Sequence, residues 1–280
     1  MIDIKRAKIN LYKHICSISL FLSSQENKFT GLIKQLKEAI PDISDQYSFG
    51  MDDFDAYLDS KLRGMHAFQC KLMLMAVEDI KKDPITVVDI GDSCGNHMRY
   101  LKTLAKEKIE AMSVNLDPVA VRKITSKGQK AILCRAEELG LKGINPDLFV
   151  TFEMVEHLHN PSIFFRRLAK QSSCSRILVT LPYRRRSRVG LLHVRRNSVK
   201  PIHAEEEHIF ELNPQDWSLL LRHSGWKVIH SEVYYQYPSK IPVLNYILRK
   251  FWERYDFEGF WGAILEKDTS LSDGYLDWED

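Results

Sequence analysis

The sequence predicts an α/β fold, in which helices cover a parallel sheet and a helical region precedes it. Within the first 80 or so residues, apolar side chains recur at three- and four-residue spacing with charges between them. From residue 85 onward, short aliphatic runs alternate with helical patterns. A chain of 280 residues with 44% apolar content can bury one substantial core. We therefore expect one main domain with an appendage.

The helical region contains two amphipathic segments, residues 29–40 and 54–80, separated by the break 41–53. Residues 15–24 are apolar and follow a lysine-rich start, as in a signal peptide, but the run is short and interrupted by serines. We interpret it as the apolar face of an N-terminal helix. No apolar run reaches the roughly 20 residues of a membrane span.

Compartment and charge are inferred from composition. The five cysteines are scattered without CxxC pairs, which argues against a disulfide framework or a structural zinc site and favours the reducing cytoplasm. A formal charge of +3 means that any basic binding surface must be local.

Seven strands are expected. The first five are the runs 85–90, 111–116, 130–135, 148–154 and 176–182. The first four lack polar alternation, as do strands buried on both faces. Helical patterns at 97–108, 118–128 and 161–172 are long enough to cross between parallel strands. A helix capped by Asn213, with Pro214 in its first turn, precedes strands 227–236 and 260–267, which flank an amphipathic helix at 241–255.

The loop in "VVDIGDSCGNH", residues 87–97, predicts a ligand site. Ligands of open parallel sheets bind beyond the carboxyl ends of the strands. Gly91 and Gly95 allow a sharp turn, and a helix beginning near Asn96 offers unpaired amides to a nucleotide-like ligand. The second and third positions of a G-x-G-x-x-G fingerprint hold Ser93 and Asn96, which disfavours nicotinamide and flavin.

Two acidic residues refine this prediction. Asp89 precedes the loop and suggests a ligand with positive charge, whereas Asp117 ends the second strand, where a carboxylate can accept both hydroxyls of a ribose. The alternative for Asp117 is a helix N-cap.

Together with "SVNLDP", "CRAEEL", "PDLFVTFEMVEHLHNP", "ILVTLP" and "HIFELNPQDWSLLLRHSGW", this loop resembles the class I S-adenosylmethionine-dependent methyltransferases. The most similar type is the small-molecule group with a Glu-His pair after strand four. The resemblance implies a Rossmann-like, seven-stranded, mostly parallel sheet with helices on both faces and the last two strands antiparallel. It divides the chain into an N-terminal helical extension or lid (1–60), a methyltransferase domain (61–270) and a C-terminal tail (271–280).

The resemblance also implies a binding site for S-adenosyl-L-methionine, with S-adenosylhomocysteine as the product. The methionine half would be cradled by the loop residues Asp89, Gly91, Asp92, Ser93, Gly95 and Asn96. Asp117 would hold the ribose, flanked by Leu116 and Pro118, and Arg135, Ala136 and Glu137 would edge the adenine. Phe152, Glu153 and Met154 would lie beneath the sulfonium. Ser93 stands where the family often has glycine, which predicts a wider loop.

Methyl transfer from a sulfonium requires that the acceptor be held in line and water excluded. A hydroxyl acceptor also needs a base, for which Glu156, His157 and His208 are the predicted catalytic residues. With Glu153, these residues resemble the metal-binding set of the small-RNA 2′-O-methyltransferases, and such a set can hold a divalent ion that lowers a hydroxyl pKa. Because Glu-His pairs after strand four also occur without metal, we predict no metal and keep this site as the alternative.

The acceptor is expected to be small and anionic. Residues 184–200 carry seven Lys or Arg side chains and no acid, so they could attract a phosphorylated or carboxylated acceptor or form only a solvated face. Interleaved aromatics are absent, which disfavours nucleic acid. The predicted acceptor residues are Tyr183, Arg184, Arg185 and His208, while Tyr234, Tyr235 and Tyr237 could line the pocket or pack in the core.

The predicted function is therefore O-methylation of a small anionic molecule. The alternatives are a metal-containing RNA 2′-O-methyltransferase and a catalytically silent, cofactor-binding partner subunit. The sequence leaves the oligomeric state open.

Overall fold

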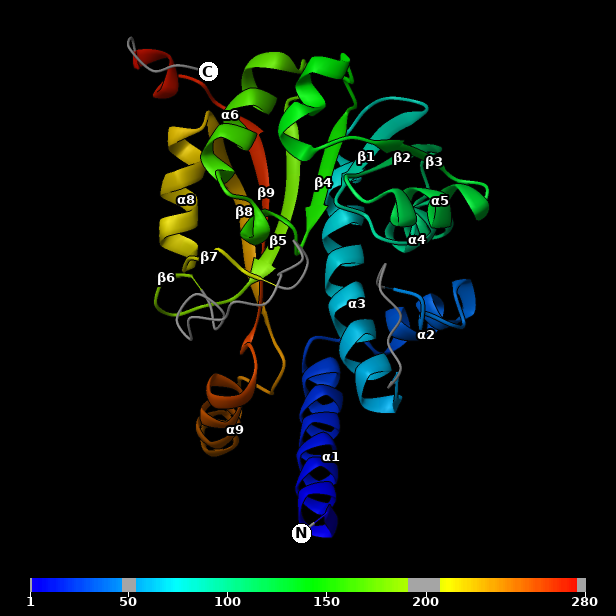
Figure 1. The fold of residues 1–280 in the computed structure, drawn as a ribbon, viewed down its shortest axis with the longest axis vertical. Coiled ribbons are helices and arrows are strands. Elements are labelled where there is room, and N and C mark those ends of the chain that lie inside the picture. Colours follow the sequence, from blue (N-terminus) through cyan, green and yellow to red (C-terminus); the bar gives the residue numbers. More distant parts are fainter. Residues whose placement is uncertain (1, 47–53, 191–206, 276–280) are drawn as a thin grey trace.

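The computed structural model describes residues 2–46, 54–190 and 207–275 (Figure 1). Its α-helices are α1 (Ile2–Glu26), α2 (Thr30–Ala39), α3 (Ala56–Glu78), α4 (Asn96–Leu104), α5 (Pro118–Ser126), α6 (Pro161–Gln171), α8 (Pro214–His223) and α9 (Pro242–Tyr255). Its strands are β1 (Ile85–Ile90), β2 (Ile109–Asn115), β3 (Lys130–Leu133), β4 (Leu148–Phe152), β5 (Arg176–Pro182), β6 (Arg188–Val189), β7 (Phe210–Glu211), β8 (Trp226–Tyr235) and β9 (Gly259–Lys267).

The seven predicted strands form one sheet, in the order β3-β2-β1-β4-β5-β9-β8. Strands β1 to β5 pair in parallel, and β9 runs antiparallel to both β5 and β8. Because β1 lies between β2 and β4, the strand order reverses beside it, and ligands of such sheets bind at this switch point. The mostly parallel sheet with an antiparallel final pair is confirmed.

One prediction about the strands was wrong. We expected the first four to be buried on both faces, but β3 is the edge strand, and its Lys130 and Leu133 are exposed. The apolar character of "KAIL" does not distinguish an edge strand from a central one, since that depends on which strands pair.

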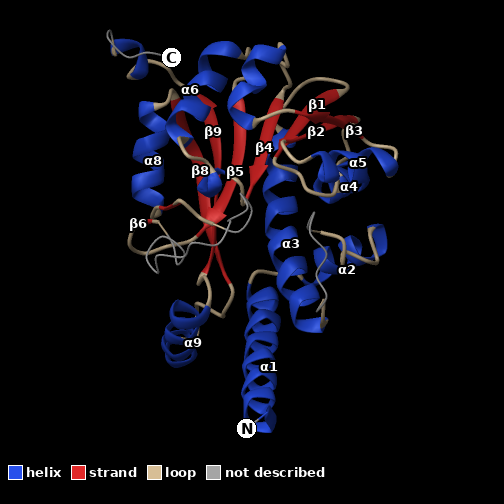
Figure 2. Ribbon diagram, viewed as in Figure 1, coloured by secondary structure: helices blue, strands red, loops and turns tan. Residues whose placement is uncertain are grey.

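Helices cover both faces of the sheet (Figure 2). Successive residues of a strand point to opposite faces, so Val87 joins one core with Phe68 and Leu72 of α3, while Val88 joins the other with Phe164 of α6 and Trp217 of α8. Such two-sided burial explains why the central strands lack polar alternation. At Gly262 of β9 an added Cβ would lie 2.3 Å from a methyl carbon of Leu72, so glycine permits the close approach of α3.

The helix starts follow local signals in the sequence. Asn213 caps α8 as predicted, its side chain accepting a hydrogen bond from the Asp216 amide at 3.0 Å, and Pro214 begins the helix. Asn160 caps α6 in the same way. The small antiparallel sheet formed by β6 and β7 was not predicted, because each strand is only two residues long.

Helices α1 and α9 project together beyond one edge of the sheet (Figure 1). They share a small core that contains Cys16 and Leu20 of α1 and Leu248 and Trp252 of α9. Helix α3 runs through the expected boundary at residues 60 and 61. Among the described helices, none combines the length and the apolar character that crossing a membrane requires.

Candidate functional site

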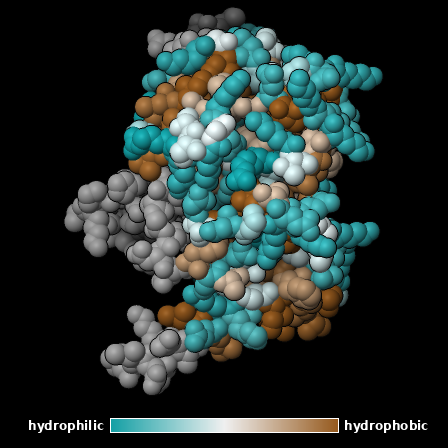
Figure 3. All heavy atoms as spheres, turned by 90° about the vertical axis from the view of Figure 1, so that its right-hand side faces the viewer, coloured by the Kyte–Doolittle hydropathy of each residue, from teal (hydrophilic) through white to brown (hydrophobic). Residues whose placement is uncertain are grey.

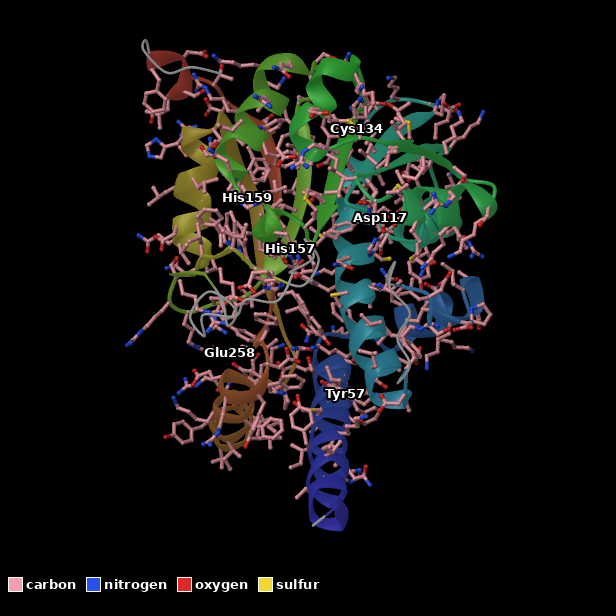
Figure 4. All side chains as sticks on the ribbon, in the orientation of Figure 1. Tyr57, Asp117, Cys134, His157, His159 and Glu258 are labelled. Carbon is pink, nitrogen blue, oxygen red and sulfur yellow. The ribbon has the colours of Figure 1, made fainter. Side chains whose placement is uncertain are left out.

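The residues predicted to bind the cofactor follow the carboxyl ends of adjacent strands. The loop 91–95 follows β1, Asp117 follows β2, and residues 153–157 follow β4. Strand register places Asp89 beside Ser113 of β2 on one side and Val150 of β4 on the other. Figure 4 labels Asp117 and His157, which belong to the segments that follow β2 and β4. The sheet therefore brings together residues that are far apart in the sequence.

Both loop glycines have positive φ angles, which residues with a side chain rarely adopt. Gly91 has φ +96°, and an added Cβ would lie 2.5 Å from Cγ of Met154. Gly95 has φ +82°, and its Cβ would lie 2.1 Å from the Gln129 side-chain nitrogen. Glycine is needed at both positions, and Met154 packs directly against the loop.

Asp92 organises this loop from within. Its Oδ1 accepts hydrogen bonds from the amides of Cys94 at 3.1 Å and Gly95 at 2.7 Å, and its Oδ2 accepts one from Ser113 Oγ at 2.6 Å. Asn115 donates to the Asp92 carbonyl at 2.9 Å. The carboxylate of Asp92 thus fixes the loop conformation, whereas the sequence had suggested only that Asp92 contacts the cofactor.

A residue that the sequence did not single out, Gln46, seals the outside of the loop. Its carbonyl accepts a hydrogen bond from Ser93 Oγ at 2.5 Å, and its side-chain oxygen accepts one from Asn96 Nδ2 at 3.0 Å. Ser93, which stands where the family often has glycine, is therefore bound by a residue of the N-terminal region. No sequence signal could reveal this contact, because 47 residues separate the two positions.

Asp89 belongs to a buried polar network beneath the loop. It is 1% exposed, its Oδ2 has no hydrogen-bond partner, and His97 Nδ1 lies 3.5 Å from that oxygen. His97 Nε2 is 2.9 Å from Gln69 Oε1, and Gln69 Nε2 donates to Thr180 Oγ1 at 3.1 Å. Burial, with repulsion from Asp92, raises the pKa of Asp89 to about 7. A buried carboxylate oxygen that has no hydrogen-bond partner, with an imidazole 3.5 Å away, can receive a ligand that brings a positive charge.

The ribose and adenine candidates lie at the edge of the sheet. Asp117 Oδ1 accepts a hydrogen bond from the Val119 amide at 2.8 Å, so Asp117 is the N-cap of α5, the alternative considered from sequence. Leu116 is 49% exposed, and Pro118 is also exposed. Ala136 and Glu137 begin the 3-10 helix η1 (Ala136–Lys142), where a guanidinium nitrogen of Arg135 lies 3.6 Å from a carboxylate oxygen of Glu137.

The chain turns sharply after β4. Phe152 ends the strand and is 8% exposed, and Glu153 has φ +48°, which is unusual for a residue with a side chain. Its amide donates to the Thr180 carbonyl at 3.0 Å, which holds the turn. Strained backbone of this kind is concentrated at functional sites. The turn leads directly into Val155–His157, a short 3-10 helix that contains Glu156.

Glu156, His157 and His208 converge. One potential ligand atom from each lies within 4.8 Å of the others, although His208 is 51 positions along the chain from His157. Both oxygens of Glu156 are buried without a hydrogen-bond partner, as is Oε1 of Glu153. This trio forms the predicted catalytic set, and Glu153 adjoins it.

Both imidazoles of this trio are oriented through Nδ1. The Nδ1 of His157 is 2.9 Å from the Glu207 carbonyl, and the Nδ1 of His208 is 3.1 Å from Oε1 of Glu211. Metal-binding histidines are commonly held in this way by a carbonyl or carboxylate, which leaves Nε2 to ligate. The donor set, one carboxylate and two imidazoles beside a second carboxylate, therefore fits a divalent cation.

The two carboxyl groups of this site have raised pKa values. Burial raises the pKa of Glu153, and burial followed by repulsion from Glu153 raises that of Glu156 well above its usual value. Burial alone would raise the pKa of Glu211, but hydrogen bonds from His208 and Arg188 lower it. A proton on the Glu153 and Glu156 pair, or a nearby cation, is what allows both carboxyls to be buried.

The basic run is largely paired where the structure describes it. Arg185 makes three hydrogen bonds to the Glu258 carboxylate, at 2.9, 3.2 and 3.1 Å. Arg184 and Arg188 lie 3.5 and 2.5 Å from Glu211, which is 2% exposed. The cations of the run at 195, 196 and 200 lie outside the described residues. Arg184, Arg185 and Arg188 therefore neutralise buried acids, which reduces the charge available to an anionic acceptor.

Some of the tyrosines pack in the core, and others could line an acceptor pocket. Tyr234 and Tyr237 are 1% and 0% exposed and pack in the core, and Tyr237 donates to Glu258 at 2.7 Å. Tyr183 is partly exposed and meets Tyr235 edge to face, with ring centroids 5.3 Å apart. Tyr183 and Tyr235 remain candidates for acceptor contact.

A polar hollow of about 360 Å³ lies elsewhere, among Lys82, Asp147 and Arg176. These residues precede or begin β1, β4 and β5, so the hollow is at the amino edge of the sheet, opposite the predicted site. Ligands of this sheet class bind at the carboxyl edge, and we assign no function to the hollow.

We compared the sequence and the structure with those of known proteins. No family model matches the sequence, and no curated protein matches it. The structure is similar to a putative sarcosine dimethylglycine methyltransferase from Galdieria sulphuraria, with TM-score 0.55 and 12% identity over 84% of this chain and 98% of that one. It is also similar to the O-methyltransferase of a trans-AT polyketide synthase multienzyme from Brevibacillus brevis, in complex with S-adenosylhomocysteine, with TM-score 0.51 and 13% identity over 76% and 75% of the two chains.

A third similar structure is the [4+2]-cyclase SpnF, with TM-score 0.51 and 13% identity over 88% of this chain and 96% of that one. The chain thus has the Rossmann-like class I methyltransferase fold. Since a cyclase shares it, the fold alone does not decide the reaction.

Proposed function

We propose that this protein transfers a methyl group from S-adenosyl-L-methionine to an oxygen atom of its acceptor. The observation that carries the proposal is that the glycine loop follows β1 and that Glu156 and His157 follow β4, its neighbour in the sheet, where His208 joins them from the segment before β7. A cofactor held by the loop would present its methyl group near groups able to remove a proton.

The loop supplies the cofactor half of the site. Asp89 offers an unpaired buried oxygen to the cationic end of the cofactor, and Asp92 keeps the loop in one conformation. Met154, packed against Gly91, brings an apolar surface that would exclude water from the sulfonium. Asp117 can cap α5 through Oδ1 and still present Oδ2 to a ribose hydroxyl.

The acceptor half rests on the histidine cluster. If no metal ion is bound, His157 or His208 would accept the acceptor's proton through Nε2, because Nδ1 of each ring is already engaged; in a metal-containing site both Nε2 atoms would instead be ligands. A divalent cation bound by Glu156, His157 and His208, with Glu153 beside them, would supply a lowered pKa at the acceptor hydroxyl. The Glu156 carboxylate, whose two oxygens are buried without a hydrogen-bond partner, favours this metal-containing form over the metal-free form predicted from sequence.

The acceptor class has two candidates. A small phosphorylated or carboxylated molecule would use Tyr183, with the exposed Arg186 as the cation not paired with Glu211 or Glu258. The second candidate is a 2′-hydroxyl of RNA, which the cluster of glutamate and histidine favours because the small-RNA 2′-O-methyltransferases that it resembles have the same donor set.

Calorimetry tests cofactor binding. S-adenosylhomocysteine should bind, NAD should not, and Asp89→Asn should weaken the binding. Product detection by mass spectrometry, with a panel of small hydroxylated acids and a short RNA as acceptors, then separates the acceptor classes. Binding of NAD rather than S-adenosylhomocysteine would refute the cofactor assignment, and binding without any methylated product would indicate a silent cofactor-binding subunit.

Metal binding can be tested independently of turnover. Titration with Mn²⁺ should stabilise the protein against heat, by about 2.7 kcal/mol when the ion is at 100 times its dissociation constant. Glu156→Gln and His157→Gln should abolish that gain. His159→Gln is the matched control, because His159 is exposed two residues from His157 (Figure 4). An equal gain in all variants would place the ion elsewhere.

A further inference from the structure

The two helices beyond the carboxyl edge expose an unusual amount of apolar surface. Of the 16 exposed large hydrophobic side chains in the described residues, nine lie on α1, on α9 or at the residue before α9. Apolar residues also cover part of the lower third of the face in Figure 3, the level at which α1 lies. Contiguous apolar surface of this kind marks interaction sites.

On α9 the exposed residues form one stripe. Val243, Tyr246, Ile247, Lys250 and Arg254 follow helical spacing on the side opposite Leu248 and Trp252, which pack against α1. Val243 is 73% exposed, Tyr246 60% and Ile247 58%. The helix is thus anchored to the protein by one face and presents the other, which we call the α9 stripe.

Charge and aromatic content identify what the α9 stripe would bind. The helix has three cations, Arg249, Lys250 and Arg254, and one acid, Glu253, which lies 2.9 Å from Lys250 and 3.6 Å from Arg249. Arg249 lies over the Tyr246 ring at 5.5 Å and Arg254 over the Tyr255 ring at 5.6 Å. Aliphatic residues with tyrosines and basic side chains beside them suit the boundary between lipid chains and headgroups.

A second copy of the chain is a poorer occupant. In a two-fold contact between α9 stripes, Lys250 and Arg254 would meet the same stripe of the partner, which contains no acid. The α9 helix contains three cations against one acid, so such a contact would bring like charges together. An excess of positive charge beside apolar side chains complements an anionic lipid surface.

We propose that α9, supported by α1, docks the protein peripherally on anionic membranes, with Val243, Tyr246 and Ile247 entering the interface and Lys250 and Arg254 contacting phosphate headgroups. Docking through one helix face is distinct from spanning the bilayer. It does not depend on the proposed methyl transfer, since none of these residues belongs to the candidate site.

Sedimentation of the 280-residue chain with lipid vesicles tests this proposal. Vesicles that contain phosphatidylglycerol should bind it, and vesicles of phosphatidylcholine alone should bind it much more weakly. The pair Val243→Asp and Ile247→Asp should lower the partition coefficient at least about tenfold. Lys250→Gln and Arg254→Gln should each lower it about fivefold and reduce its dependence on salt.

The matched control is Leu219→Asp with Leu271→Asp, which adds the same charge at exposed apolar positions away from α9. These controls should bind like the unmodified chain, and melting curves should confirm that all variants are folded. The proposal is overturned if phosphatidylglycerol vesicles do not bind the protein, or if the α9 variants and the controls bind alike. Concentration-dependent dimerisation that Val243→Asp and Ile247→Asp abolish, without vesicle binding, would assign the α9 stripe to a second copy and also overturn it.

Discussion

Arg63 of α3 joins the end of α2 to Tyr100 of α4, and replacing it tests how strongly this part of the N-terminal region is held. Its side chain is 1% exposed. The guanidinium donates to the carbonyls of Ile40 and Pro41 at 2.8 Å each and to that of Leu36 at 3.3 Å, and it contacts Asp59 and Tyr100. Arg63→Met keeps the length and apolar stem of the side chain but removes all of these donors.

We expect Arg63→Met to lower the free energy of unfolding by about 3–5 kcal/mol, the usual effect of breaking a buried charged network by removing one partner. The carbonyls at the end of α2 would lose their donor while still buried. For a chain of this size, such a loss lowers the melting temperature by about 10 °C. Urea unfolding followed by circular dichroism measures the free energy directly.

Arg99→Met is the matched control, because Arg99 also reaches a carbonyl near the end of α2 but through one contact of 3.5 Å to Ala39. It should cost less than about 1 kcal/mol. The segment held by Arg63 leads to Gln46, which contacts Ser93 and Asn96, so Arg63→Met should also weaken S-adenosylhomocysteine binding. If Arg63→Met destabilises no more than Arg99→Met, the network does not anchor the N-terminal region and the reasoning is refuted.

Three further predictions concern the loop and a helix cap. Because burial raises the pKa of Asp89 to about 7, its ionised fraction should rise from roughly a tenth at pH 6 to nine tenths at pH 8, so cofactor affinity measured by calorimetry should rise up to about tenfold. Asp89→Asn should bind more weakly and without this pH dependence; a persistent dependence would assign it to another group. Gly91→Ala should cost about 2–4 kcal/mol in urea unfolding, because it combines φ +96° with a clash against Met154. Gly128→Ala, with φ +73° and open space, should cost only about 1 kcal/mol, and equal losses would rule out the clash. Asn213→Ala should lower stability by about 1 kcal/mol through loss of the α8 cap, which thermal melting can measure; an unchanged melting temperature would contradict the capping role.

The order of the strands and helices could be predicted from the sequence. The runs at 85–90 and 176–182 coincide with β1 and β5, because a strand buried on two faces has a continuous apolar sequence. Asn213 and Pro214 marked the start of α8, since capping depends on residues adjacent in the chain. The glycine loop was also recognisable, because Gly91 and Gly95 are required by local backbone conformation.

Which distant side chains lie together could not be predicted from the sequence and follows from the folded chain. Sequence suggested His208 as a partner of His157, but chain folding is what brings them and Glu156 within 4.8 Å. The basic run was expected to attract an anionic acceptor. In the structure, however, Arg185 pairs with Glu258 and Arg188 pairs with Glu211, from elsewhere in the chain. Pairing between distant residues depends on how strands and helices pack, and the periodicity of a sequence does not specify that packing.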